Sequence, residues 1–305
     1  MVDVSPATPS APCRIAILGP TASGKSALAV AVAQRLGGSV VNGDPFQAYR
    51  DLPVGTGQPT PAEMGPVPHL GYGLLPLETR LNPAGFGELV RTWLEAPGPV
   101  LVTGSGLYLR GIWNQLTELP DVPASLSARV RRWSELLGAP ALHRYLAAVD
   151  PVRAAALHPN DGSRVQRALA LHLATGRRAS QLLQGTRAGV PEGWRALLVL
   201  PERERQRVRV AARVRQMLAQ GWALEAERLR AAGFEAELRR LRPLGYEILL
   251  DRRGGTSRII QETQAYAKRQ STFFRNQWPE LPTWDPDTEP VEAAFERLGL
   301  SYSPQ

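Results

Sequence analysis

Four short apolar runs in the sequence have the pattern of buried β-strands. They are residues 14–18 (RIAIL), 39–42 (SVVN), 100–103 (VLVT) and 196–200 (ALLVL). Short runs of this kind, rich in apolar residues and bounded by glycine or polar residues, are typical of strands that are covered on both faces. Between the first two runs, Leu28, Val32 and Leu36 recur at helical spacing. The order strand, loop, helix, strand predicts the opening of a parallel α/β sheet.

The rest of the chain shows mainly helical periodicity. Residues 125–181 carry no convincing strand pattern, so we expect an all-helical insertion, and two long helices are predicted at about 203–232 and 257–278. The Pro- and Gly-rich stretch 51–85 is expected to form loops over the edge of the sheet. We therefore divide the chain into a disordered tail (1–12), the first part of the α/β core (13–118), a helical insertion (119–190), the second part of the core with its long helices (191–280) and a C-terminal tail (281–305).

Cysteine content and the N-terminal sequence exclude several classes of protein. Cys13 is the only cysteine, which excludes an intramolecular disulfide framework and a cysteine-rich zinc site, and we expect it in a buried strand. No apolar run reaches the roughly 18 residues of a membrane span. The start, MVDVSPATPSAP, lacks the basic and apolar regions of a secretory signal. We expect a cytoplasmic protein without a membrane partner.

The net charge of +8 is concentrated in the second part of the chain. Residues 1–118 carry a net charge of −1 and the remainder +9, and residues 127–178 hold 9 arginines against 3 acidic residues. Such an excess is typical of proteins that bind a polyanion, of which nucleic acid is the commonest. A solvated arginine-rich surface explains the charge equally well, so the charge alone does not decide between the two.

Residues 19–26 (GPTASGKS) fit the phosphate-loop pattern GxxxxGK[ST]. In such a loop the glycines let backbone amides curl around a phosphate, Lys25 adds positive charge, and the hydroxyl of Ser26 suits Mg²⁺. The motif follows a predicted strand and opens a predicted helix, whose dipole directs its positive end at the same anion. We therefore favour a phosphate-binding loop over an ordinary Gly-rich turn.

The phosphate loop alone leaves the reaction class open. The strand 100–103 ends in Gly104 rather than in the aspartate that holds the metal in many ATPases. Asp44 is the only acidic residue at the carboxyl end of a predicted strand, and that edge faces the ligand in an open α/β sheet. Three interpretations remain: transfer of a group from a diphosphate, a P-loop small-molecule kinase, and an RNA-binding protein with a vestigial nucleotide site.

Several further motifs follow the phosphate loop along the chain. They are DPFQAYR (44–50), GTGQPT (55–60), PHL (68–70), TGSGLY (103–108), HPND (158–161), Arg164, RAL (167–169), TG (175–176), LGYE (244–247), AKRQ (267–270) and Arg275. Together with the loop, this series resembles the tRNA isopentenyltransferase family, the tRNA dimethylallyltransferases, over about residues 14–275. The resemblance implies a P-loop NTPase-like parallel sheet with a helical tRNA-binding insertion.

The resemblance also implies a reaction and its partners. A dimethylallyl group would pass from dimethylallyl diphosphate to the exocyclic amine of the adenosine 3′ to the anticodon. Mg²⁺ at Ser26 would be the cofactor, and the tRNA anticodon stem-loop the macromolecular partner. Asp44 is expected to accept a proton or hydrogen bond from the amine, and Ser105 to form a hydrogen bond nearby. We expect the protein to act as a monomer.

Two sets of binding residues follow from the same resemblance. The diphosphate is expected at Gly19, Pro20, Thr21, Ala22, Ser23, Gly24, Lys25, Ser26, Arg209 and Arg213. The tRNA is expected at Asp44, Pro45, Phe46, Gln47, Ser105, Arg129, Arg164, Gln166, Arg167, Gly245, Tyr246, Lys268, Arg269 and Arg275. Arg205, Arg209 and Arg213 are spaced four residues apart, so they share one stripe of the predicted helix.

The sequence departs from the family pattern at several positions. Pro45 stands where the family has serine and Gln58 where it has lysine, and both changes are expected to alter contacts with tRNA. The other departures are Thr103 for glycine, Ser105 for threonine, Gln264 for arginine and Phe273 for tryptophan. Asp44, Lys25 and Ser26 are kept, so the reaction class implied by the resemblance is unchanged.

Overall fold

The fold is taken from a computed structural model that describes residues 14–183, 189–252 and 254–302. The predicted tail 1–12 and the expected strand position of Cys13 lie outside these residues. The chain divides into two compact units, one formed by residues 1–115 with 187–305 and the other by residues 116–186.

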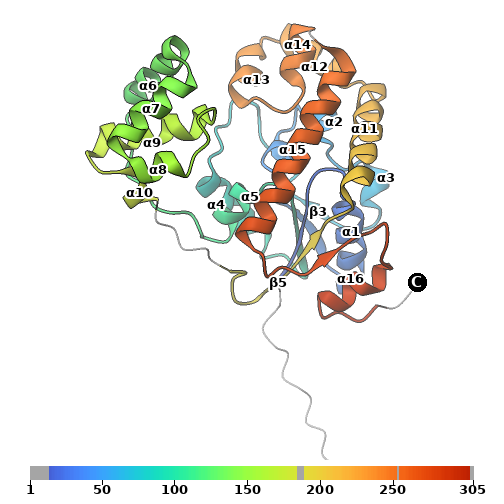
Figure 1. Cartoon of the computed structure of the whole chain (residues 1–305). Coiled ribbons are helices and arrows are strands. Elements are labelled where there is room, and N and C mark those ends of the chain that lie inside the picture. Colours follow the sequence, from blue (N-terminus) through green and yellow to red (C-terminus); the bar gives the residue numbers. More distant parts are fainter. Residues whose placement is uncertain (1–13, 184–188, 253, 303–305) are drawn as a thin grey trace, which may run out of the picture. The chain divides into compact units, whose positions relative to one another are not determined.

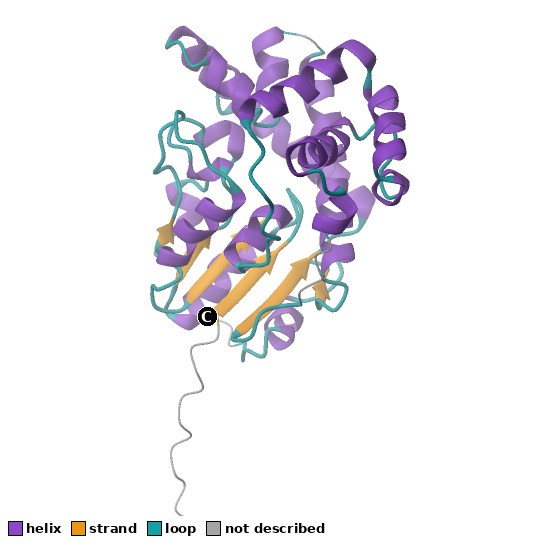
Figure 2. Cartoon of the chain, turned by 90° about the vertical axis from the view of Figure 1, so that its left-hand side faces the viewer, coloured by secondary structure: helices purple, strands orange, loops and turns teal. Residues whose placement is uncertain are grey.

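The first unit is built on a sheet of six parallel strands in the order β3-β2-β4-β1-β5-β6 (Figure 2). The strands are β1 (Arg14–Leu18), β2 (Ser39–Asn42), β3 (His69–Leu70), β4 (Pro99–Thr103), β5 (Trp194–Val199) and β6 (Thr283–Trp284). The parallel α/β sheet is confirmed, and the four predicted runs form β1, β2, β4 and β5. The pattern does not predict β3 and β6, which are two residues long and occupy the edges of the sheet.

Helices connect the strands and cover the sheet (Figure 1). In the first unit they are α1 (Lys25–Leu36), η1 (Phe46–Ala48), α2 (Pro53–Thr56), α3 (Pro61–Met64), α4 (Pro83–Trp93), α5 (Gly106–Ile112), α11 (Arg203–Ala219), α12 (Trp222–Ala231), α13 (Glu235–Leu241), α14 (Tyr246–Asp251), α15 (Gly255–Gln277) and α16 (Val291–Arg297). The predicted helix 257–278 is confirmed as α15. The predicted helix 203–232 is two helices, α11 and α12, because Gly221 interrupts it in a left-handed conformation with φ of 99°. The stretch 51–85 is expected to form only loops, but it also contains α2, α3, β3 and the start of α4.

Side chains of each strand alternate between two apolar layers. On one face, Ile15 and Ile17 of β1 lie in a cluster with residues of α1 and α16. On the other face, Ala16 and Leu18 lie in a cluster with residues of α4, α5 and α15. Because helices cover both faces, the strands of this sheet have no polar face and form the continuous apolar runs seen in the sequence.

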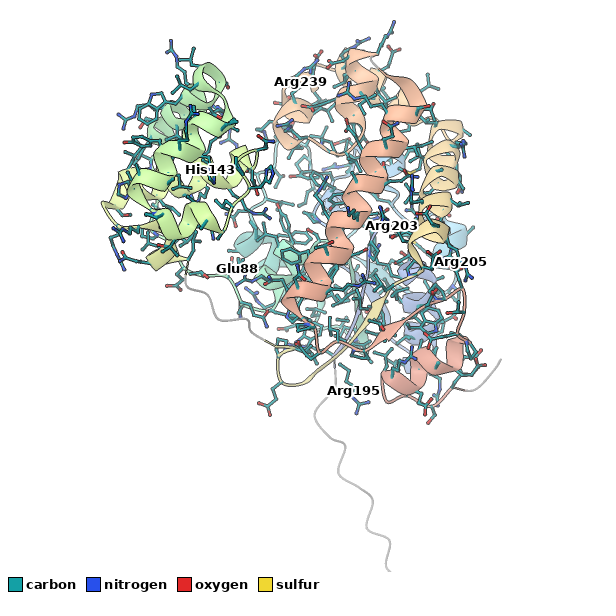
Figure 3. The ribbon with its side chains drawn as sticks, viewed as in Figure 1. Glu88, His143, Arg195, Arg203, Arg205 and Arg239 are labelled. Carbon is teal, nitrogen blue, oxygen red and sulfur yellow. The ribbon has the colours of Figure 1, made fainter. Side chains whose placement is uncertain are left out.

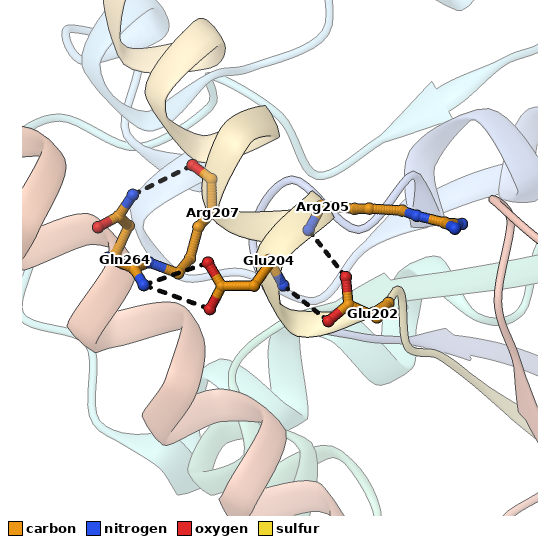
Figure 4. Close-up of polar contacts among 5 residues, drawn as sticks. All are labelled: Glu202, Glu204, Arg205, Arg207 and Gln264. Atoms are coloured by element: carbon orange, nitrogen blue, oxygen red, sulfur yellow. Dashed lines mark hydrogen bonds and ion pairs between the residues drawn. The ribbon is translucent and has the colours of Figure 1, made fainter.

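Polar contacts join α11 to α15, which pack against each other (Figure 1). Glu202 caps α11 by accepting hydrogen bonds from the backbone N–H groups of Glu204 (3.1 Å) and Arg205 (3.2 Å) (Figure 4). Gln264 of α15 donates to the carbonyl oxygen of Arg207 at 3.1 Å, and Arg207 pairs with Glu204 at 3.2 Å. The side chain of Arg205 extends away from the other four residues (Figure 4).

The C-terminal part of the chain, expected as a tail, returns to the sheet. It contributes β6, which pairs with β5, and then α16. Arg195, near the start of β5, donates to the carbonyl oxygens of Leu298 and Gly299 at 3.0 Å each and so attaches the end of α16 to the sheet (Figure 3).

Helices are the only regular secondary structure in the described residues of the second unit, which confirms the all-helical insertion. Its helices are α6 (Ala124–Leu137), α7 (Ala139–Val149), α8 (Pro151–Ala155), α9 (Gly162–Thr175) and α10 (Ala179–Leu182). They surround a buried cluster that includes Val130, Leu146 and Leu169. Asp161 caps α9 by accepting from the backbone N–H of Arg164 at 3.3 Å. In the part of the chain that the structure describes, no helix has the length and apolar character of a membrane span.

Candidate active site

The phosphate-loop motif connects β1, in the interior of the sheet, to α1. The neighbours of β1 are β4 and β5: after β1 the chain crosses to β2, on the β4 side, and after β4 it crosses past β1 to β5 on the other side. The carboxyl end of β1 is therefore a point at which the strand order diverges. Open α/β sheets bind their ligands in the crevice at such a point.

The loop has a conformation that its glycines permit and that leaves the start of α1 open to an anion. Gly24 precedes α1 with φ of 92°, and a Cβ at Gly19 would lie 2.6 Å from the carbonyl oxygen of Val199. The ammonium of Lys25 donates to the carbonyl oxygen of Pro20 at 3.2 Å. No side chain caps α1 and its first turn contains no acidic residue, so its N–H groups are suited to bind a phosphate.

Two glutamines from distant helices fix the loop at Thr21. Gln270 of α15 accepts a hydrogen bond from the Thr21 N–H at 2.9 Å and donates to the carbonyl oxygen of Gly104 at 2.8 Å. Gln206 of α11 donates to the Thr21 carbonyl oxygen at 3.2 Å. Both glutamine side chains are buried, with relative exposures of 7% and 6% for Gln270 and Gln206. Gln270 thus joins the phosphate loop to the loop after β4.

Asp44 lies at the carboxyl end of β2 and is held there by Asn42. The Asn42 side chain accepts from the backbone N–H of Asp44 at 2.8 Å and donates to the carbonyl oxygens of Asp44 and Gly71, each at 2.9 Å. One oxygen of the Asp44 carboxylate accepts from the N–H of Phe46 at 3.0 Å. Asn42 is fully buried, so its hydrogen bonds hold the backbone of this turn in one conformation. The position of the Asp44 carboxylate is fixed with it.

A cavity of about 510 Å³ contains both the phosphate loop and Asp44. Its polar wall includes Lys25, Ser26, Asp44, Gln47, Arg213 and Gln270. Its apolar wall includes Val210, Val214, Met217, Trp222 and Leu244. An anion site and a carboxylate therefore face the same cavity, and an apolar group has a surface to bind in it.

The cavity changes the acidity of its charged groups. Desolvation in the cavity and the nearby charge of Arg213 lower the pKa of Lys25 to about 8, although Asp44 opposes this effect. Desolvation also raises the pKa of the Asp44 carboxyl, against hydrogen bonds from the backbone of Phe46 and Gln47 and the charge of Lys25. Both groups are therefore closer to neutral pH than in water, which is typical of groups that exchange protons or stabilise charge at a reaction centre.

Most of the residues expected to bind the diphosphate line this cavity. They are Thr21, Ala22, Ser23, Gly24, Lys25, Ser26 and Arg213. Gly19 and Pro20 form the start of the same loop. Arg213 is held by a hydrogen bond to the carbonyl oxygen of Gly57 at 3.2 Å. Arg209 is not part of the cavity wall: it contacts the carbonyl oxygen of Ser23 at 3.4 Å and pairs with Asp287.

The residues expected to contact tRNA in the first unit fall into three groups. Asp44, Phe46, Gln47 and Arg269 line the cavity. Lys268 and Arg275 line a separate groove between α11 and α15.

The four residues of the third group are not part of the cavity wall. Pro45, Gly245 and Tyr246 are buried, and the Tyr246 hydroxyl donates to Glu225 at 2.5 Å. We therefore correct the expected tRNA contact of Tyr246, because its ring packs in the apolar cluster around α12 and α14. Ser105 follows β4, but the cavity wall among the described residues includes Thr103 and Gly104 and not Ser105.

The remaining expected tRNA contacts lie in the helical unit. Arg129 stacks over the ring of Trp133 at 5.4 Å on α6. Gln166 and Arg167 lie on α9, and Arg164 pairs with Asp161 at 2.6 Å while 65% of its side chain stays exposed. The pairing leaves most of the Arg164 side chain exposed, so a phosphate group can reach it.

The donors around Ser26 fit a magnesium ion that is bound mainly through phosphate oxygens. Among the described residues there is no group of three or more His, Cys, Asp or Glu side chains placed to hold a metal alone. The Ser26 hydroxyl and the carboxylates of Asp44 and Glu63 do line the cavity. Mg²⁺ usually keeps several waters and takes one or two protein oxygens together with substrate phosphates. The oxygen donors present are compatible with that mode of binding.

The functional residues that sequence patterns missed are Gln206, Gln270 and Asn42. Each acts through hydrogen bonds to the backbone of another segment, and the two glutamines lie 185 and 249 residues from Thr21. Gln270 is the last residue of the AKRQ motif, which is the one signal that could have indicated it.

Comparisons with known proteins agree with this arrangement. A family profile described as IPP transferase matches residues 47–277, and one described as isopentenyl transferase matches residues 14–68. A tRNA dimethylallyltransferase of Methylobacterium radiotolerans is 40% identical, covering 92% of this chain and 96% of its own. One of Rhodospirillum centenum is 41% identical, covering 88% and 90%.

Solved structures show the same fold. The tRNA isopentenylpyrophosphate transferase of Bacillus halodurans superimposes with a TM-score of 0.65 at 29% identity, covering 95% of each chain. A eukaryotic dimethylallyltransferase acting on tRNA superimposes with a TM-score of 0.69 at 22% identity, covering 92% of this chain and 77% of its own. The P-loop NTPase-like core is thus shared across these proteins. The chain therefore belongs to the tRNA dimethylallyltransferase family, and it transfers a dimethylallyl group to tRNA.

Proposed function

We propose that the cavity binds dimethylallyl diphosphate on the phosphate loop and that Asp44 activates the exocyclic amine of the adenosine 3′ to the anticodon. The observation that carries this proposal is the presence of Lys25 and Asp44 in the wall of one cavity. The family assignment decides against the small-molecule kinase and the vestigial RNA-binding site that the loop alone left open.

The transfer requires one bond to form and one to break. The amine nitrogen forms a bond to the prenyl carbon, and the bond from that carbon to the diphosphate oxygen breaks. The amine then loses a proton, and the Asp44 carboxylate is the acceptor in this proposal. The diphosphate leaves with growing negative charge, which Lys25, Arg213 and the N-terminus of α1 stabilise.

The two walls of the cavity suit the two ends of the donor. The diphosphate would lie on the loop, and Mg²⁺ held by its oxygens and Ser26 would supply further positive charge when bound. The dimethylallyl group is apolar, so it is expected against Val210, Val214 and Met217, where its burial is favourable.

The acceptor base must leave its stack to enter such a cavity, because its amine is otherwise poorly accessible. Arg164 and Arg167, exposed on α9 of the helical unit, are proposed to hold the backbone of the anticodon stem-loop. A tRNA acceptor agrees with the predicted cytoplasmic location. That location and the monomeric state stay predictions.

The direct test is transfer in vitro. The protein with Mg²⁺, dimethylallyl diphosphate and an anticodon stem-loop with adenosines 3′ to the anticodon should yield an RNA that is heavier by one dimethylallyl group. Mass spectrometry of nuclease fragments locates the modified base. A stem-loop in which only that adenosine is replaced by guanosine is the matched control. Transfer to the control, or no transfer to the parent while it still binds, would refute the proposed acceptor.

Salt dependence tests the proposed contacts of the groove between α11 and α15. We expect Lys268→Ala and Arg275→Ala each to weaken binding of the stem-loop and to reduce the slope of log affinity against log salt by about 1. The reason is that binding releases fewer counterions from the RNA when the protein makes one phosphate contact fewer. Arg35→Ala, on α1 and outside the groove, is the control. Titrations at several salt concentrations measure the slopes, and unchanged slopes would contradict the assignment of these two residues.

A further inference from the structure

The segment after β6 lies beside the phosphate loop. Its Pro286 and the nearby Arg209 face the loop but are not part of the cavity wall, so we call this the outer side of the loop. The carboxylate of Asp285 accepts from the backbone N–H groups of Glu202 (3.2 Å) and Asp287 (3.0 Å), and the Asp285 N–H donates to Glu289 at 2.9 Å. These bonds fold residues 285–289 against the start of α11. Pro286 then lies 3.8 Å from the position that a Cβ on Gly24 would take.

Asp287 reaches the phosphate loop through Arg209. One nitrogen of the Arg209 guanidinium pairs with Asp287, and the other donates to the carbonyl oxygen of Ser23 at 3.4 Å. The Asp287 side chain is 16% exposed and that of Arg209 is 36% exposed, so water only partly competes for the pair. Among the described residues, the second Asp287 oxygen is buried without a hydrogen-bond partner, so its attachment to the protein depends on Arg209.

The contact with Ser23 bears on the anion site because of the geometry of the peptide unit. The peptide that joins Ser23 to Gly24 is trans, so its C=O and its N–H point in opposite directions. A donor that holds the Ser23 carbonyl on the outer side of the loop therefore directs the Gly24 N–H to the inner side. Inward N–H groups are what a phosphate loop offers to its ligand.

We propose that Asp287 is a positioning residue for the diphosphate: it holds Arg209 against the Ser23 carbonyl and so keeps the Ser23–Gly24 peptide oriented for binding. This inference rests on the proposed binding of diphosphate to the loop. It also gives Arg209 a role in the outer support of the loop instead of the direct contact expected from the sequence. Arg209 is charged, but its charge is paired with Asp287 and it does not line the cavity.

The test compares Asp287→Asn with wild-type protein. We expect the affinity for magnesium diphosphate, measured by calorimetry, to fall about tenfold, because the ion pair between Arg209 and a carboxylate is replaced by a hydrogen bond to an uncharged amide, which holds Arg209 less firmly. The KM for dimethylallyl diphosphate should rise by a similar factor, while kcat at saturating donor and the affinity for the stem-loop stay unchanged. Glu204→Gln, which removes the exposed ion pair to Arg207 on the same helix, is the matched control and should leave the affinity for magnesium diphosphate and the KM for the donor unchanged.

A double-mutant cycle separates this role from a general effect on stability. If Asp287 acts through Arg209, Asp287→Asn combined with Arg209→Gln should weaken diphosphate binding no more than Arg209→Gln alone. Additive effects, an unchanged affinity in Asp287→Asn, or tighter binding in that variant would each overturn the inference. If the wild-type protein showed no transfer, the proposed function would be refuted and not this inference. The two failures can be told apart because the diphosphate affinities of variant and wild type are measured without transfer.

Discussion

The Asp44→Asn protein should bind both substrates and transfer almost nothing, with a rate lower by about 100-fold to 10,000-fold, the range for loss of a positioned general base. The asparagine oxygen can still accept from the Phe46 N–H, so the turn after β2 is kept, but the amide cannot take a proton at neutral pH. Single-turnover transfer with saturating donor and stem-loop measures the effect. Asp51→Asn, seven residues further on and outside the cavity wall, is the matched control. A normal rate in Asp44→Asn would contradict the role of the carboxylate.

The same substitution should make the protein more stable near neutral pH. Desolvation raises the pKa of Asp44 in the folded protein above the value of about 3.9 in an unfolded chain. Because the folded state then binds the proton more tightly, ionisation of Asp44 lowers stability as pH rises through the interval between the two pKa values. The neutral asparagine avoids this cost, so Asp44→Asn should melt at a higher temperature at pH 7 and at the same temperature as the wild type below about pH 3. A lower melting temperature at pH 7 would show that the carboxylate stabilises the fold.

The parts of this protein that the sequence predicts are those governed by local patterns. The four buried strands follow from apolar runs such as 14–18, because helices cover both faces of the sheet. The phosphate loop follows from a spacing of glycines and Lys25 that has one known structural use. Asp44 follows from its place after a strand, since parallel strands bring their carboxyl ends to one edge of the sheet.

The parts that sequence patterns miss depend on contacts between distant segments. Strands β3 and β6 are two residues long, and their conformation comes from pairing with β2 and β5 rather than from their own composition. The hydrogen bond of Gln270 to Thr21 spans 249 residues, and no local pattern marks such a contact. Tyr246 shows the reverse case: it belongs to a family motif, but tertiary packing buries its ring beside Trp222.

Lys25→Ala should slow transfer severely while leaving the affinity for the stem-loop unchanged, because the lysine charge acts on the diphosphate. Loss of one preorganised group that stabilises growing charge typically costs about 100-fold to 1,000-fold in rate. Lys268→Ala, which removes the only other lysine of the chain from a separate groove, should have the reciprocal effect: weaker binding of the stem-loop and an unchanged KM for the donor. Equal loss of both affinities in Lys25→Ala would contradict this division of roles.

The lowered pKa of Lys25 predicts that transfer depends on pH in the alkaline range. The lysine is protonated and useful below its pKa of about 8 and loses its charge as pH rises through that value. The kcat/KM for dimethylallyl diphosphate, which reports the free enzyme, should therefore fall above about pH 8. Lys25→Arg keeps the charge at all these pH values, so its kcat/KM, although lower, should lose this alkaline decline. Bound diphosphate raises the pKa of Lys25 by its negative charge, so the decline in kcat should begin at a higher pH than that in kcat/KM. Profiles of wild type and Lys25→Arg that decline in parallel would assign the alkaline step to another group.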